Sequence, residues 1–279
     1  MRFLYFLTFL SLLATSSLLA QDIQTGETKK KKLHGEFFFE WGYHRDAYTN
    51  STIHFEDRVT GNYSFTLHNA VAEDKPDWDN FFKTPLTVPQ YVMSGGYFFN
   101  DKHDLGIELC WNHLKYVVSD YQTLHLTGDI EGVRYDLDTL VTPDFVHFEH
   151  TNGNNYLMLS LLKRFQFLQS KNLKHRLSAN IRFGGGALVP KTDSYIMGKH
   201  NDGPFRVSGY VIGVGGALRY DAFRYLFLQF GVKGSFANYT DAKLYLQGRA
   251  QHSFFSAQYI LSAGFNIPTK GYKARPTIF

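Results

Sequence analysis

The sequence predicts an all-β protein that folds as a transmembrane antiparallel up-and-down β-barrel of about twelve strands, with about ten as the alternative. Three observations lead to this prediction. Aromatic residues make up 17% of the 279 residues, although the mean hydropathy is slightly negative at −0.26. Long segments of the C-terminal half alternate between apolar and polar residues. Past residue 20, no apolar run approaches the roughly 20 residues of a membrane-spanning helix.

Residues 1–20 have the layout of a secretory signal peptide. Arg2 precedes an apolar run that begins at Phe3, and small residues lead to Ala20. This arrangement predicts export and cleavage after Ala20. Residues 21–35, which include a run of lysines at 29–32, are then expected to form a basic tail in the periplasm.

Alternation with a period of two is typical of a β-strand, because successive side chains point to opposite faces. Near the C-terminus, Tyr259 and Leu261 fall on an apolar face, whereas Gln258 and Ser262 fall on a polar face. Lipid cannot hydrogen-bond backbone amides, so such strands cross a membrane only as a closed barrel. The apolar faces are expected to meet lipid and the polar faces to fill the lumen. Strands are predicted near residues 36–45, 51–58, 62–71, 91–100, 104–118, 120–130, 144–151, 154–167, 173–188, 205–221, 223–238 and 251–267.

The barrel is expected to span residues 36–267, with a C-terminal tail at 268–279. Tyr210 and Tyr220 stand at the two ends of one apolar face. Their spacing corresponds to roughly 33 Å along a strand, or about 25 Å of membrane height at a tilt of about 40°. The segment 131–143 is too long for a short turn between strands, so it either extends a hairpin or marks a miscounted strand.

The familiar catalytic motifs are absent from the sequence. It has no G-x-S-x-G element, no P-loop and no H-E-x-x-H motif, and its single cysteine, Cys110, cannot form an intrachain disulfide. We therefore expect no cofactor and no metal site. The formal net charge of +4 is modest and the lysine run is interpreted as a solvated tail, so no nucleic-acid partner is expected.

Polar residues at the outer ends of the predicted strands form a candidate binding cluster at the rim and in the lumen. Its members are His44, Arg45, His54, His113, Lys115, Lys191 and Asp193. Converging imidazole, carboxylate and cationic groups suit acid–base chemistry or the binding of an anionic headgroup. The alternative is structural, because polar side chains inside a barrel must pair with one another.

From about residue 35 to residue 267, the chain resembles Gram-negative outer-membrane β-barrel proteins. The resemblance lies in the export signal, the alternating strands fringed with aromatic residues and the unequal loop lengths. It implies a location in the outer membrane, contact with outer-membrane lipid and insertion by the barrel assembly machinery. It identifies no subfamily and leaves the oligomeric state open.

The motif FEHTNG, within residues 148–154, is similar to the His-x-Ser-Asn signature of the outer-membrane lipid A deacylases. This resemblance implies that His150 acts as a base, with Glu149 and Asn152 as further candidate catalytic residues. The serine of the signature has no counterpart, because Thr151 follows the histidine directly. The parity that places Phe148 toward lipid would also turn His150 outward.

Three functions are compatible with these observations. The first is a barrel with a narrow, polar-filled lumen in a structural or small-solute role, since the aqueous channel of a porin needs about 16 to 18 strands. The second is a hydrolase that modifies the acyl chains of lipid A or phospholipid. The third is a narrow anion-preferring channel lined by Arg176, Arg182 and Lys233. Whether the protein is an enzyme is left open, and a soluble periplasmic β-sandwich is the alternative to a membrane protein.

Overall fold

The computed structural model describes residues 35–75, 90–99 and 103–269. These residues contain seventeen β-strands and no helix, so no described helix could cross a membrane. The predicted signal peptide at 1–20 lies outside the described residues. The same holds for nearly all of the predicted basic tail and for most of the C-terminal tail.

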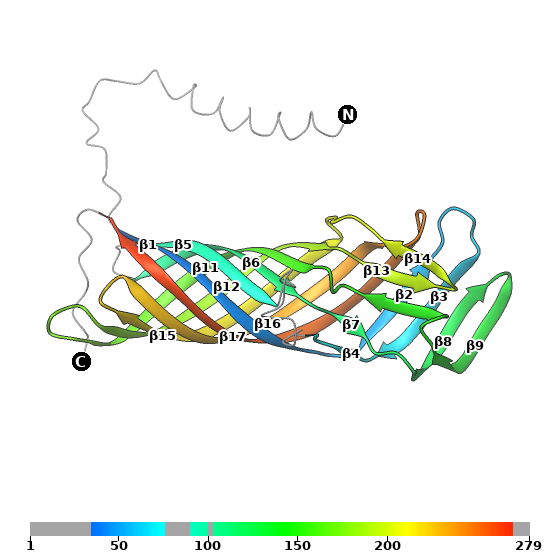
Figure 1. Cartoon of the computed structure of the whole chain (residues 1–279), viewed down its shortest axis with the longest axis horizontal. Helices are drawn as coiled ribbons and strands as arrows, with labels where there is room; N and C mark the ends of the chain where they lie inside the picture. Colours follow the sequence, from blue (N-terminus) through cyan, green and yellow to red (C-terminus); the bar gives the residue numbers. More distant parts are fainter. Residues whose placement is uncertain (1–34, 76–89, 100–102, 270–279) are drawn as a thin grey trace, which may run out of the picture. The chain divides into compact units, whose positions relative to one another are not determined.

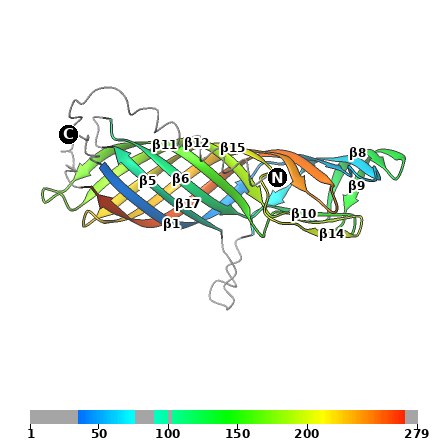
Figure 2. The ribbon, with the colours of Figure 1, turned by 90° about the horizontal axis from the view of Figure 1, so that it is seen from above.

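Eight strands form a barrel, which is a closed ring of antiparallel pairs. Around the ring they are β1 (Gly35–Tyr48), β5 (Tyr91–Phe99), β6 (Leu105–Leu114), β11 (Asn154–Gln169), β12 (Arg176–Pro190), β15 (Gly209–Ala222), β16 (Leu226–Lys243) and β17 (Arg249–Pro268). The pairing of β1 with β17 closes the ring, with Trp41 opposite Ala263. Figures 1 and 2 show these strands as a tilted wall.

The wall of the barrel is apolar outside and polar inside. Leu228 and Leu261 point outward and are 54% and 56% exposed, whereas their neighbours Gln229 and Ser262 are buried in the lumen. Lipid is the medium that matches such an outer surface, so this is the distribution of a membrane-spanning barrel. The predicted antiparallel β-barrel is therefore confirmed, and so is the predicted outward parity of the strands that form it.

One end of the barrel, which we call the turn end, has short connections. Residues 170–175 join β11 to β12, and residues 223–225 join β15 to β16. The first residues of β1 and the last residues of β17 also meet here, because Glu36 lies opposite Pro268.

At the opposite end, the remaining strands form a region that we call the cap. It consists of an extension of the barrel sheet and a second, separate sheet. Four strands extend the barrel sheet from the edge of β17 and give it twelve strands: β2 (Ser51–Glu56), β3 (Tyr63–Ala70), β8 (Gln122–Ile130) and β9 (Val133–Val141). The second sheet has the order β14 (Lys199–Asp202), β13 (Asp193–Ile196), β10 (Val146–Glu149), β7 (Val117–Val118) and β4 (Ala72–Glu73).

The cap has a hydrophobic core between its two sheets. Phe55 from the main sheet contacts Phe148 from the second sheet, with ring centroids 5.5 Å apart, and Phe65 stacks on Phe145 at 5.7 Å. Phe55, Phe65 and Phe148 have no exposed surface. Burying one such side chain contributes roughly 1.5–3 kcal/mol to stability. The cap is therefore stabilised in the manner of a water-soluble sandwich.

The strand β17 passes through both regions and reverses its polarity between them. In the cap, the inward residues His252 and Phe254 are buried in aromatic surroundings, while the outward residues Gln251 and Ser253 are exposed and polar. From Phe255 to Ile267, the outward side chains are apolar, and the inward side chains are polar with the exception of Ile260. The antiparallel pairing with β16 is regular across this change, so the reversal comes from residue type alone.

The hairpin of β8 and β9 accounts for the unassigned segment 131–143. Its turn places Glu131 and Gly132 at φ values of 49° and 79°. Two consecutive positive φ values define the type I′ turn, whose twist matches that of a two-stranded hairpin. The segment therefore extends a hairpin, and it also supplies a strand, β9, that the predicted set of strands omitted.

The main sheet has twelve strands, the number predicted for the barrel, but only eight of them close into a ring. The set also differs, because β9 was not predicted and the strand predicted at 144–151 is β10 of the second sheet. The segments predicted at 51–58, 62–71, 120–130 and 144–151 lie in the cap, and the ring closes with the other eight. A period of two shows that one face of a strand is apolar, but it does not show whether that face meets lipid or a protein core.

Candidate functional site

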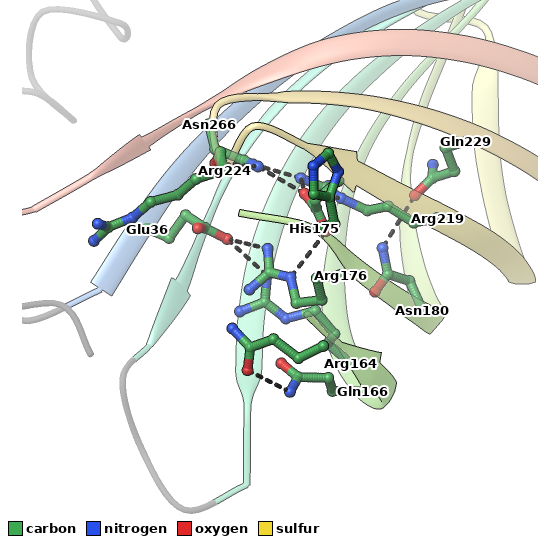
Figure 3. A network of polar contacts seen from close by, with 12 residues as sticks. Glu36, Arg164, Gln166, His175, Arg176, Asn180, Arg219, Arg224, Gln229 and Asn266 are labelled. Atoms are coloured by element: carbon green, nitrogen blue, oxygen red, sulfur yellow. Dashed lines mark hydrogen bonds and ion pairs between the residues drawn. The ribbon is translucent and has the colours of Figure 1, made fainter. Parts of the chain in front are cut away.

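The lumen near the turn end is filled by a network of ion pairs (Figure 3). Glu36 accepts hydrogen bonds from Arg164 at 2.7 Å and from Arg176 at 2.9 Å. Arg164 also binds Asp104 through two nitrogens, at 2.8 and 2.9 Å. Arg176 donates to Asp221 at 2.9 Å. Charges that are buried and paired on several sides hold one geometry, so this layer is a rigid plug.

Arg219, on β15 with Asp221, completes the layer. Its guanidinium donates to Asp221 at 3.1 Å and lies 3.4 Å from the ring centroid of Phe227. Asn266 donates to the same carboxylate at 2.7 Å. The plug holds three arginines, Arg164, Arg176 and Arg219, against three carboxylates, Glu36, Asp104 and Asp221. It is therefore close to neutral.

A second polar layer fills the middle of the lumen. Arg182 lies 3.2 Å from Glu108 and 3.6 Å from Glu40. Glu40 also accepts hydrogen bonds from Ser94 at 2.8 Å and Gln229 at 2.9 Å. All five side chains are at least nine-tenths buried. Lys233, on β16, donates to Asn112 at 2.7 Å.

The cations that were expected to line a channel are thus occupied by lumen partners. A cavity beside Arg176 and another beside Arg182 and Lys233 each measure about 10 Å³. A volume of this size holds about one water molecule. Neither cavity is wide enough to pass a hydrated anion.

Where the barrel meets the cap, two histidines form a buried pair. His150 Nε2 lies 3.4 Å from His252 Nε2, and Thr192 Oγ1 lies 3.1 Å from His150 Nδ1. Ser51 Oγ is 3.3 Å from His252 Nδ1. The ring of Tyr239 stacks on both imidazoles, at centroid distances of 5.0 and 4.5 Å. Hydroxyl groups therefore close both ends of the histidine pair.

The predicted catalytic residues do not converge. His150 has no exposed surface and faces the cap core, so the expectation that it points outward to lipid is wrong; Val146 and Phe148 are core residues of the cap. Glu149 lies on the opposite face of β10, and Asn152 is exposed in the following loop. Burial lowers the pKa of His150 to about 3, which leaves its imidazole neutral and a weak base.

The candidate binding cluster divides into separate places. Inside the barrel, His44 contacts Asp46 at 3.0 Å, and His113 contacts Asn155 at 2.9 Å. Lys115 is buried close to His113. Arg45 points outward and pairs with Asp74, and His54 bonds Thr66 on the outer face of β2. Asp193 lies on the second sheet of the cap and pairs with His200, whereas Lys191 lies in the connection before β13 and pairs with Asp202.

A polar row that was not predicted from the sequence lies on the outer face of the second sheet. His147 contacts Asp120 at 2.9 Å and Glu149 at 3.6 Å. Hydrogen bonding to Glu149 and then to Asp120 raises the pKa of His147 to about 9. The alternation of His147 and Glu149 with Val146 and Phe148 is the sequence signal that marks this face.

A metal centre finds no support in the described residues, where no group of three or more His, Cys, Asp or Glu side chains is placed to hold an ion. Cys110 is a buried free thiol.

Comparisons with known proteins give a remote likeness to bacterial barrels. No family model matches the chain, and no curated protein matches it. The solved structures include Ail of Yersinia pestis, with 10% identity over 84% of this chain and 99% of that chain, and a TM-score of 0.33. The barrel domain of OprF from Pseudomonas aeruginosa has 11% identity, coverage of 84% and 98%, and a TM-score of 0.31. The protease OmpT from Escherichia coli has 8% identity, coverage of 87% and 99%, and a TM-score of 0.34. Likenesses this remote do not assign a function.

Proposed function

We propose that the protein is an outer-membrane barrel with a closed, polar-filled lumen that holds the cap at the cell surface, in a structural or binding role. The observation that carries this proposal is the reversal of polarity along β17. The outward face of β17 is apolar in the barrel, where it suits lipid, and polar in the cap, where it suits water. The cap therefore stands clear of the bilayer.

The proposed orientation follows from the connections of the barrel. Outer-membrane barrels have short periplasmic turns and long extracellular loops. Here the short connections, the first residues of β1 and the last residues of β17 all lie at the turn end. The long connections form the cap. We therefore place the turn end in the periplasm and the cap outside the cell.

The paired lumen favours this role over the channel and hydrolase alternatives. A channel needs cations that are free to exchange counter-ions, whereas Arg176 and Arg182 are held by buried carboxylates. A hydrolase needs a histidine that a lipid ester can reach, whereas His150 and the neighbouring Thr192 are buried. The purified chain in planar bilayers should be silent, and a reproducible anion-selective current would contradict the closed lumen.

Cysteine labelling on intact cells tests the orientation. Cys110 is buried, so an introduced surface cysteine is the reactive thiol. Lys199→Cys places it on the cap, and Lys174→Cys places it at the turn end as a matched control. A membrane-impermeant maleimide should label the Lys199→Cys variant on intact cells and the Lys174→Cys variant only after the envelope is opened. The reverse pattern, or labelling of neither on intact cells, would refute the orientation.

A further inference from the structure

The main sheet ends in a long strand with one open side. β8 is the only partner of β9 in the described part of the chain. The edge strands of the second sheet are much shorter, because β4 has two residues and β14 has four, whereas β9 has nine. Figure 1 shows the β8–β9 hairpin at the end of the cap. An open edge of this length offers unpaired backbone groups to another strand.

Both faces of β9 are accessible. On the inner face, Val133 is 53% and Leu137 is 44% exposed, and Tyr135 between them packs partly against the cap core. On the outer face, Arg134 and Asp136 are exposed. The open edge therefore combines an apolar row and a charged row, which any added strand would have to match.

A second copy of β9 matches both rows in one antiparallel register. Pairing of two identical antiparallel strands is two-fold symmetric, so the register is defined by the residue that lies opposite itself. With Tyr135 in that place, Arg134 of each copy faces Asp136 of the other, and Val133 faces Leu137. Opposite charges and apolar pairs directly across an antiparallel ladder are stabilising.

The neighbouring registers are worse. With Leu137 opposite itself, Asp136 faces Asp138. With Arg134 or Asp136 opposite itself, two like charges meet at the two-fold axis. Like charges directly opposite each other are destabilising. An edge that carries charges of one sign resists pairing, whereas the edge of β9 carries both signs at a spacing that pairs with itself.

We propose that β9 pairs antiparallel with β9 of a second copy of this chain, with Tyr135 at the two-fold axis, so that one sheet runs through two caps. The inference rests on the proposed function, because the cap must stand outside the membrane to reach another cap. It goes further by naming the partner and the strand that binds it.

The test is the mass of the full mature chain in detergent micelles, measured by light scattering at protein concentrations above about 10 µM. The wild type should have the mass of two chains. In the proposed register, Arg134→Asp places a carboxylate opposite a carboxylate at two positions, and Asp136→Arg places a guanidinium opposite a guanidinium at two positions. Each variant should therefore have half that mass. An equimolar mixture of the two variants should recover the dimer, because the two carboxylates of one variant then face the two guanidiniums of the other.

The control is Lys199→Asp, which makes the same charge change as Arg134→Asp on an exposed position of β14. It should remain dimeric. A monomeric wild type, a dimeric Arg134→Asp variant, or a mixture that stays monomeric would each overturn the proposal. Recovery in the mixture also shows that both variants are folded. The labelling experiment reports where the cap lies and the mass reports what it binds, so either can fail alone.

Discussion

The barrel and the cap are built from the same antiparallel ladder, and they distribute polarity in opposite directions. In the barrel, Leu261 faces out and Ser262 faces in, whereas in the cap Ser253 faces out and Phe254 faces in. All four residues belong to β17 and to one uninterrupted pairing with β16 or β1. The surrounding medium, rather than the strand geometry, therefore decides which residue type a face requires.

The two regions also hold their interiors together by different forces. The barrel interior is stabilised by buried ion pairs such as Glu36 with Arg164 and Arg176, and its geometry depends on every charge being matched. The cap interior is stabilised by contacts between apolar rings such as Phe55 and Phe148. Removing one charge from the barrel should therefore cost more than removing one charge from the surface of the cap.

The largest effect is expected from Glu36→Gln in the plug. It leaves Arg164 and Arg176 without their shared carboxylate, and breaking a buried pair in this way costs about 3–5 kcal/mol. Asp202→Asn, which removes the partly exposed partner of Lys191, should cost about 0–1 kcal/mol. Equilibrium unfolding in phospholipid vesicles measures both changes. Equal losses would show that the plug does not behave as a buried network.

The next effect tests the outer surfaces on a single strand. Leu261→Arg puts a charge in the middle of the lipid-facing run of β17 and should cost about 2–4 kcal/mol of unfolding free energy. Ser253→Arg makes an outward charge on the same strand within the cap and should change stability by no more than about 0.5 kcal/mol. A similar cost at both positions would place Ser253 in the bilayer and would remove the boundary between the two regions.

The smallest effect is a dependence of cap stability on pH through His150. Its pKa is about 3 in the folded cap and about 6.5 in an unfolded chain, so between these values only the unfolded state binds the proton. Stability should fall as the pH drops below about 6.5, by up to about 1.4 kcal/mol per pH unit. Hydrogen exchange of cap amides between pH 7 and pH 5 measures the slope.

His150→Gln is the control for this slope. It cannot take up the proton, so its slope should be smaller than that of the wild type by the contribution of one group. An unchanged slope would mean that other groups carry the pH dependence of the cap.

Local sequence patterns were enough to predict the β class, the antiparallel barrel and the side to which each barrel strand turns its apolar residues. The alternation from Phe255 to Ile267 predicted correctly which side chains point outward, because the period of two is a local property of an extended chain. The polar filling of the lumen was also predictable, since Arg176 and Arg182 fall on the polar faces of long strands. These results need no knowledge of which strands are neighbours.

The boundary between the barrel and the cap could not be predicted in this way, because it depends on which strands pair with one another. Phe148 alternates with polar residues as a lipid-facing strand would, and the ring that closes without its strand places it in a protein core instead. The placement of His150 away from Glu149 and Asn152 follows from the same packing. Whether an apolar face meets lipid or another sheet depends on contacts between residues far apart in the chain, and a local pattern contains no information about them.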